Sequence, residues 1–484
     1  MDRPNIIVIL CDQMRGDAFG ADGNACVQTP NMDFLAARGA RFNHAYSAVP
    51  SCLPARAILW TGMDQWHAGL LGMGRGQGRI PNDYPHTLAG ELAKAGYQTH
   101  LVGKGHFTPQ RALMGFDGAE LEESGRAEDP GFVSEYRRWF AENAPAGVGP
   151  DDHGVDFNAW QGRPWHAAEH LHPSAWTMTT AMEFLRRREQ DRPLFLNVSF
   201  ARPHSPYVPP QPYWDMYIDS PTPAPSVGDW AAMNDHPETA ADPNAWRGRM
   251  TPQQVHRARA GYFGDISFID TQIGRLMNWM RRTQPKVFAN TWFLLTSDHG
   301  DMQGDHYMWR KTYAYEGSAR IPFVLCPPRG LGVRRALAEE VVELRDVMPT
   351  VLQIAGLPCP TTVQGRSVLP LLNAPADDWR PYLHGEHCWC YGAEQEMQYV
   401  TDGRQKFIWL PRIGVQQFFD LTGDGGECRN LIAESAWQER IAVWRQRLID
   451  ELAARNCGWC AGGKLACPDE PLTSPYRDRR WQGA

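Results

Sequence analysis

The sequence predicts an α/β fold with a large, mainly parallel central sheet flanked by helices, followed by a smaller C-terminal antiparallel sheet and helix. Three short apolar runs lack the strict alternation of half-exposed strands and suit strands buried on both faces. These runs occupy residues 5–10, 194–200 and 292–297. Segments with helical character separate them, at residues 87–94, 177–189 and 265–280. Strands that alternate with helices are typical of a layered fold around a parallel sheet.

The helix at 265–280 has the clearest pattern of the three. Its apolar residues recur every three or four positions, which places them on one helical face. They are Ile266, Ile269, Ile273, Leu276 and Met280. This segment is therefore expected to cover one face of the sheet.

Polar residues that carry chemistry follow two of the strands. Asp12 comes just after the first run, and Asp298 and His299 come directly after the third. Ligands of open α/β sheets bind at the carboxyl ends of the strands. The sequence therefore predicts a functional site at this edge.

Two regions depart from the alternating pattern. Residues from about 115 to 175 are rich in Gly, Pro, Trp, His and acidic residues and suggest an irregular insertion over the sheet edge. From about 380 onward, short strands near 398–400, 406–410 and 417–421 precede a helix at 436–453. We expect a catalytic domain over residues 1–379 and a C-terminal subdomain over 380–484.

The composition indicates a globular protein without a nucleic-acid or membrane partner. The 484 residues are 43% hydrophobic and 21% charged, and the formal net charge is −7. No apolar segment reaches the length of a membrane span. The N-terminal residues run into the first strand without the cleavage region of a signal peptide, and eleven cysteines suit reduced thiols, so we expect a cytoplasmic location.

The segment 49–57 holds the most informative motif. Pro54 suits the first turn of a helix, which places Cys52 at the helix N-terminus, where free N–H groups favour oxyanions. Arg56 adds a permanently charged donor on the same turn. The structural alternative is a buried thiol beside a surface helix.

The spacing Cys52-x-Pro54-x-Arg56 resembles the C-x-P-x-R signature of the sulfatase family, within the alkaline phosphatase superfamily. Further motifs similar to those of the family follow in the same order along most of the chain. They are Pro4–Ile6 with Asp12, Thr29–Asp33, Thr61–Gly62, Gly103–Phe107, Arg202–Pro206, Asp298–Asp301, Lys311, Arg320–Pro322, Asp346–Thr350, Phe419–Leu421 and Asn430–Leu431.

The resemblance implies a nucleophile and a metal site. Cys52 corresponds to the cysteine that a maturation enzyme oxidises to formylglycine, whose hydrated aldehyde is the nucleophile. Asp12, Gln13, Asp298 and His299 correspond to ligands of one divalent ion, Ca²⁺ or Mn²⁺, with the modified Cys52 completing the shell. Most sulfatases have Asp-Asp and Asp-Asn pairs at these positions, whereas Asp-Gln with Asp-His resembles the phosphonate monoester hydrolase branch. An imidazole moves preference toward Mn²⁺, Zn²⁺ or Fe²⁺.

The resemblance also implies the other catalytic residues. Arg56 and Lys104 would steady the nucleophile and the developing charge. His204 and Lys311 would bind the sulfate group and protonate the leaving oxygen. His106 would take the proton that expels sulfate and regenerates the aldehyde.

Two further clusters remain open. Cys457 and Cys460, with Cys467, could form a metal or redox motif, but tail cysteines without such a role are the favoured interpretation. The segment 384–390 holds His384, His387, Cys388 and Cys390 in close succession, and it either borders the active site or is a packed strand end.

The leading hypothesis is hydrolysis of aryl or small organic sulfate monoesters. A phosphonate monoester hydrolase or phosphodiesterase with the same nucleophile is the nearest alternative. An unmodified, inactive sulfatase-like binding protein is the alternative outside enzymes. We expect the partners to be a small sulfate ester, a formylglycine-generating enzyme and further copies of the chain in a homo-oligomer.

Overall fold

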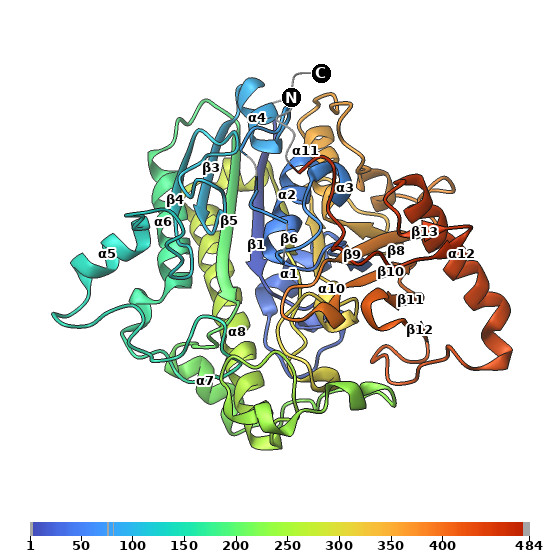
Figure 1. Cartoon of the computed structure of the whole chain (residues 1–484). Coiled ribbons are helices and arrows are strands. Elements are labelled where there is room, and N and C mark those ends of the chain that lie inside the picture. The colour runs from blue at the N-terminus through green and yellow to red at the C-terminus, as the bar shows by residue number, and fades with distance from the viewer. Residues whose placement is uncertain (1–2, 75–76, 81, 478–484) are drawn as a thin grey trace.

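The computed structural model describes residues 3–74, 77–80 and 82–477. An eight-stranded sheet lies at its centre with the strand order β4-β3-β5-β1-β6-β7-β2-β8 (Figure 1). The strands are β1 (Asn5–Asp12), β2 (Ala40–Tyr46), β3 (Gln98–Gly103), β4 (Gly118–Leu121), β5 (Leu194–Pro203), β6 (Thr291–Ser297), β7 (Phe323–Cys326) and β8 (Leu337–Glu343).

The sheet is mainly parallel, which confirms the predicted fold class. Strand β1 pairs in parallel with β5 and with β6. Strand β7 alone among the eight runs antiparallel to its neighbours β6 and β2. All eight residues of β1 are buried, because its alternate side chains enter two separate apolar cores, one on each face. A run of apolar residues without alternation is the expected sequence for such a strand.

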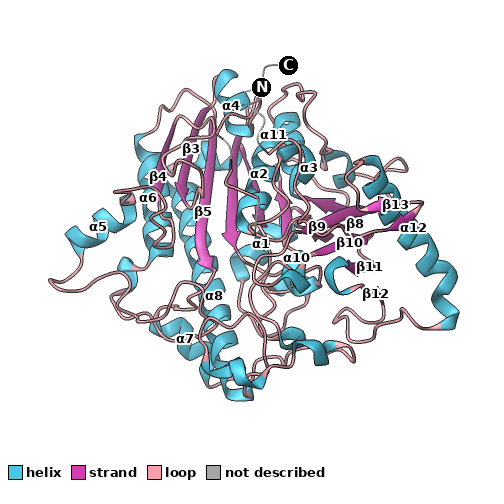
Figure 2. Ribbon diagram, viewed as in Figure 1, coloured by secondary structure: helices cyan, strands magenta, loops and turns pink. Residues whose placement is uncertain are grey.

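Helices cover both faces of the sheet (Figure 2). Helices α1, α6 and α8 supply one core, and α2, α4 and α11 supply the other. The helices are α1 (Pro30–Arg38), α2 (Cys52–Thr61), α3 (Gln65–Ala68), α4 (Leu88–Lys94), α5 (Glu135–Asn143), α6 (Pro173–Arg187), α7 (Gln211–Ile218), α8 (Pro252–Thr283), α9 (Pro285–Ala289), α10 (Glu316–Ala319), α11 (Val347–Ile354) and α12 (Gln438–Ala454).

Helix α8 begins thirteen positions earlier than the apolar periodicity indicated. Thr251 caps it, accepting a hydrogen bond from the backbone of Gln254. Its first half contains Gly261, where a Cβ atom would lie 2.8 Å from the Tyr207 side chain. The close packing requires a small residue there, and this interrupts the apolar pattern that the sequence analysis used.

The segment 115–175 is less irregular than expected, and that prediction is wrong in part. Strand β4 lies in this segment and extends the central sheet by pairing in parallel with β3. Helix α5 lies there too. Strand β4 has only four residues, most of them half-buried at the sheet edge, so it lacks the apolar run of an inner strand.

The C-terminal region contains the expected small antiparallel sheet, with strand order β12-β11-β10-β9. Helix α12 packs on it, and their apolar side chains share one core. The strands are β9 (Leu383–His387), β10 (Met397–Thr401), β11 (Gln405–Leu410) and β12 (Val415–Asp420), and β13 (Cys460–Ala461) pairs with β14 (Lys464–Leu465). The domain boundary near residue 380 stays a prediction. Within the described ranges no helix has the length and apolar character of a membrane span.

Asp346, just before α11, is a fully buried carboxylate that ties three backbone segments together. It accepts hydrogen bonds from the backbone of Glu343 and Arg366 and an ion pair from Arg380. Removing one partner of a buried ion pair leaves the other charge uncompensated. We expect Asp346→Ala to lower the free energy of unfolding by about 3–5 kcal/mol, measured by urea denaturation.

The exposed Asp377 provides a matched control, because Asp377→Ala removes a carboxylate from the same region without a buried partner. Its effect should stay within about 0.5 kcal/mol. Equal midpoints for the two variants would show that the Asp346 network contributes nothing.

Candidate active site and metal centre

Cys52 lies at the first position of α2, at the carboxyl edge of the central sheet. The residue before it, Ser51, is extended, and Pro54 occupies the first turn, where a backbone N–H is not required. All ten residues of α2 are buried, and Cys52 has no exposed surface. The alternative of a surface helix is therefore wrong.

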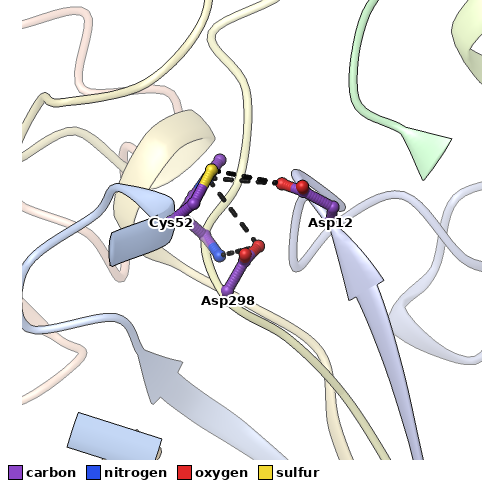
Figure 3. A group of neighbouring side chains, drawn as sticks. Asp12, Cys52 and Asp298 are labelled. Atoms are coloured by element: carbon purple, nitrogen blue, oxygen red, sulfur yellow. Dashed lines mark hydrogen bonds and ion pairs between the residues drawn. The ribbon is translucent and has the colours of Figure 1, made fainter. Parts of the chain in front are cut away.

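Four side chains converge on one point beside this helix. They are Asp12 at the end of β1, Cys52, and Asp298 and His299 after β6. Their ligand atoms all lie within 4.8 Å of one another, and all four residues are buried. Figure 3 shows the Asp12, Cys52 and Asp298 side chains pointing toward a common centre. Because β1 and β6 are parallel neighbours, their following residues meet at the same edge.

The distances within this cluster suit one divalent ion. Cys52 Sγ lies 3.2 Å from His299 Nε2 and 3.6 Å from Asp12 Oδ1. His299 Nε2 is also 3.7 Å from Asp298 Oδ1. The other ring nitrogen of His299 donates to Gly300 O at 2.9 Å, which directs Nε2 toward Cys52 and the two carboxylates. Two carboxylates, one imidazole and residue 52 thus form a fitting donor set.

Two buried cations face the same cluster. Lys104 Nζ forms an ion pair with Asp12 and lies 3.5 Å from Cys52 Sγ. Arg56 Nε donates to Asp298 Oδ2 at 3.0 Å, and its Nη1 donates to Lys104 O at 2.7 Å. Burial and Asp12 act to raise the pKa of Cys52, but Lys104, Lys311 and His299 outweigh them and lower it to about 6. The surroundings of residue 52 therefore favour a negative charge.

Gln13 contacts the cluster through its backbone. Its N–H donates to Asp298 Oδ1 at 3.1 Å. Its side-chain Oε1 accepts from Lys311 Nζ at 2.8 Å, and its Nε2 donates to Asp301 Oδ2 at 2.5 Å. The side chain thus lies at the site, and its role as a metal ligand stays a prediction.

His204 and Lys311 form a buried pair next to Gln13. Lys311 Nζ donates to His204 Nε2 at 2.6 Å, and His204 Nδ1 donates to Ser205 O at 2.8 Å. Burial lowers the pKa of Lys311, and burial together with Lys311 holds the pKa of His204 well below its usual value. The pair is therefore one cation shared between two side chains, as a neutral imidazole accepts from an ammonium.

His106 contacts two glutamates, and none of its hydrogen bonds or ion pairs among the described residues reaches the metal cluster. Its backbone N–H donates to Glu123 Oε1 at 2.9 Å, and its Nε2 is 3.7 Å from Glu128 Oε1. Its Nδ1 is buried without a hydrogen-bond partner in the described part of the chain. Burial, Arg126 and Lys104 hold the pKa of His106 well below its usual value. Its predicted role in sulfate release is not tested by these contacts.

The structure adds two residues to which the sequence analysis gave no role. His387 Nε2, at the end of β9, lies 2.8 Å from Ser51 Oγ, directly beside Cys52. The segment 384–390 therefore borders the site, as one of the two interpretations stated. Asp301 accepts from Gln13 and from Tyr207 Oη, and its place in the Asp298–Asp301 motif was the available signal.

The C-terminal cysteines do not form a second metal centre among the described residues. Across 3–74, 77–80 and 82–477, the Asp12 cluster is the one group of at least three His, Cys, Asp or Glu side chains close enough to share an ion. Cys457, Cys460 and Cys467 are free thiols.

The mixed sheet and the C-terminal antiparallel sheet together define an alkaline phosphatase-like fold. A phosphonate monoester hydrolase from Agrobacterium radiobacter has this fold, with a TM-score of 0.76, 23% identity and coverage of 97% of this chain and 99% of that one. The sulfatase family model matches residues 4–357, and the model for the C-terminal region of N-sulphoglucosamine sulphohydrolase matches residues 304–454. The chain belongs to the sulfatase family.

Two curated relatives are similar over most of their length. An arylsulfatase from Clostridium perfringens is 41% identical over 475 residues, which cover 96% of this chain and 97% of the relative. A choline-sulfatase from Rhizobium meliloti is 31% identical over 455 residues, covering 89% and 82%. The sulfatase resemblance inferred from the motifs is confirmed.

Proposed function

We propose that this protein hydrolyses aryl or small organic sulfate monoesters with a formylglycine nucleophile derived from Cys52. The observation that carries the proposal is the convergence of Cys52 with Asp12, Asp298 and His299, faced by Lys104 and Lys311. The 41% identity to an arylsulfatase supports the same activity.

The buried cations would hold the substrate and the nucleophile in place. Lys104 lies 3.5 Å from the Cys52 sulfur and can neutralise charge on the group that replaces it. Arg56 fixes the Asp298 carboxylate and the Lys104 backbone, so it orients the site. The residues of the site are buried, and charge interactions are stronger in such surroundings than in bulk water.

The His204 and Lys311 pair would supply the proton for the departing oxygen. The proton shared between Nζ and Nε2 lies beside Gln13, whose Oε1 also accepts from Lys311 Nζ. General acids of this kind act when they lie within hydrogen-bond reach of the leaving oxygen. His106 would take the proton whose loss releases sulfate.

A divalent ion held by Asp12, Asp298, His299 and residue 52, with Gln13 beside it, would polarise the ester oxygens and lower the pKa of the attacking hydroxyl. We infer Mn²⁺ or Ca²⁺ as this ion. The His299 imidazole favours Mn²⁺.

The phosphonate monoester hydrolase activity is the second candidate. The imidazole in the metal cluster favours it, because this donor set resembles that branch of the superfamily. Sulfate monoesters and phosphonate monoesters both carry one negative charge on a tetrahedral centre, so the same cations suit either.

The deciding experiment compares kcat/KM for a nitrophenyl sulfate and a matched phenylphosphonate monoester. The protein is co-expressed with a formylglycine-generating enzyme and supplied with Mn²⁺ or Ca²⁺. We expect the sulfate to be the better substrate. A preference for the phosphonate would overturn the proposal in favour of the second candidate.

Mass spectrometry of the Cys52 peptide separates an enzyme from a binding protein. Formylglycine at residue 52 is expected in protein from the native host. A peptide that contains only cysteine, together with no turnover of either ester, would leave the binding-protein hypothesis.

A further inference from the structure

A polar cavity of about 210 Å³ lies beside the ends of β4 and β5. It has room for several waters, at about 30 Å³ each. None of the proposed metal ligands or catalytic residues lines it. Its polar lining includes Glu122, Ser124, Arg137, Asp151, Trp165 and Arg202.

Arg202 brings a buried positive charge to this cavity. Arg202 is only 6% exposed. Its Nη1 donates to the backbone oxygens of His204 at 3.0 Å and Ser205 at 3.4 Å, and its Nε has no partner in the described part of the chain. Among the described residues Arg202 forms no close ion pair, and its charge acts only at longer range on the buried carboxyl groups of Glu122 and Asp265.

The groups around Arg202 do not supply that counterion directly. Glu122 is 3% exposed, its Oε1 accepts from Ser124 N at 2.7 Å, and its Oε2 has no partner among the described residues. Burial raises the pKa of Glu122, although Arg202 opposes this effect. A carboxyl group that is more readily protonated is a weaker counterion and can itself donate a hydrogen bond.

Trp165 lines the same cavity. Its Nε1 is buried without a partner among the described residues, and a buried indole N–H normally has one. By contrast, Arg137 is already paired with Asp151, at 2.6 Å and 2.8 Å. Of the two arginines that line the cavity, Arg137 therefore forms an ion pair and Arg202 does not.

We propose that this cavity binds a small oxyanion group, a sulfate or a carboxylate, against Arg202. A planar guanidinium with free donors matches the oxygens of such a group. Arg202 also donates to the backbone oxygen of His204, so the bound anion would be linked through Arg202 to the predicted proton donor.

The anion has two potential sources. It is either a free inorganic ion or an anionic substituent on the organic part of the ester. Phe157 lines the cavity, its carbonyl accepts from Ser205 Oγ at 3.1 Å, and its ring lies 5.7 Å from the Arg126 guanidinium carbon. Arg202 lines the cavity and donates to the backbone oxygen of His204, so the cavity adjoins the segment that carries this predicted catalytic residue. The substituent source rests on the proposed function, whereas the inorganic source does not.

The first experiment measures thermal stability during titration with sodium sulfate, with sodium chloride at equal ionic strength as the reference. It uses the full-length wild-type protein, Arg202→Met, Glu122→Gln and Arg137→Gln. Anion binding at the metal cluster and the general effect of sulfate on stability are common to all four proteins.

We expect Arg202→Met to raise the half-saturating sulfate concentration at least tenfold. Arg137→Gln should keep the wild-type value, and Glu122→Gln, which retains the acceptor for Ser124 N, should keep or lower it. Parallel titrations for all four proteins would overturn the proposal. A tenfold weakening in Glu122→Gln together with an unchanged Arg202→Met would also overturn it, since sulfate would then bind without Arg202.

The second experiment distinguishes the sources by steady-state kinetics. It compares a nitrophenyl sulfate with a nitrophenyl sulfate that carries a ring carboxylate. If the anion is a substituent of the substrate, Arg202→Met should raise the ratio of KM for the carboxylated ester to KM for the plain ester at least tenfold, whatever it does to both through the His204 turn. An unchanged KM ratio with altered sulfate titration assigns the site to a free ion. If neither ester is turned over, the proposed function fails while the titration still tests the cavity.

Discussion

Replacing Cys52 by alanine is expected to lower kcat/KM for a nitrophenyl sulfate by about 10⁴-fold or more, because removal of a catalytic nucleophile has effects of this size. The folded structure should persist. Alanine keeps the helix start, and α2 retains nine other buried residues that anchor it. The measurement is steady-state kinetics together with the thermal midpoint of the variant.

Cys326→Ala is the matched control for this variant. Cys326 is also a buried, free thiol, but β7 places it opposite Phe293 near the start of β6, at the other edge of the sheet. Its activity should stay close to that of the wild type. Turnover by Cys52→Ala at a similar level would refute covalent catalysis by residue 52.

Removing the divalent ion is expected to abolish hydrolysis, and Mn²⁺ should restore it at least as well as Ca²⁺. The acceptors of Asp12 and Asp298 suit either ion, but the His299 nitrogen favours Mn²⁺. Activity is measured after treatment with a chelator, dialysis and titration with each ion. Restoration by Ca²⁺ alone would contradict the role of the imidazole.

Thermal stability gives a second measurement that does not depend on turnover. An ion that binds only the folded state stabilises it by about 2.7 kcal/mol at 100 times its dissociation constant. Asp298→Asn should lose much of this increase, because the site then has one carboxylate fewer. A metal-dependent stabilisation that is unchanged in Asp298→Asn would place the ion elsewhere.

The sequence allowed the inner part of the sheet to be predicted because those strands are buried on both faces. Strands β1, β5 and β6 appear as apolar runs, and the order of their polar neighbours predicted which residues meet. Asp12, Asp298 and His299 come together because parallel neighbours end at one edge. Strand β4 was missed because an edge strand of four residues has no such run.

Contacts between distant segments were the part that sequence patterns could not supply. The Ser51 and His387 side chains are 336 positions apart, and no local periodicity relates them. The burial of Arg202 without a close ion pair could not be predicted for the same reason, since an arginine before a proline does not indicate what surrounds it. The Gly261 contact in α8 shows that close packing can also remove the pattern that announces a helix.

If Cys52 is oxidised as proposed, its complete burial implies an order of events during biosynthesis. A modifying enzyme needs access to the Cys52 side chain, yet the finished fold encloses it and places His387 of a much later segment against its neighbour. The proposed oxidation of this thiol would therefore precede the docking of β9, while the emerging polypeptide is still open. Folded, unmodified protein mixed with the maturation enzyme should remain unmodified, whereas the same protein unfolded beforehand should react, as followed by mass spectrometry. In this protein the nucleophile would form only if oxidation of Cys52 is faster than the folding of the last third of the chain around it.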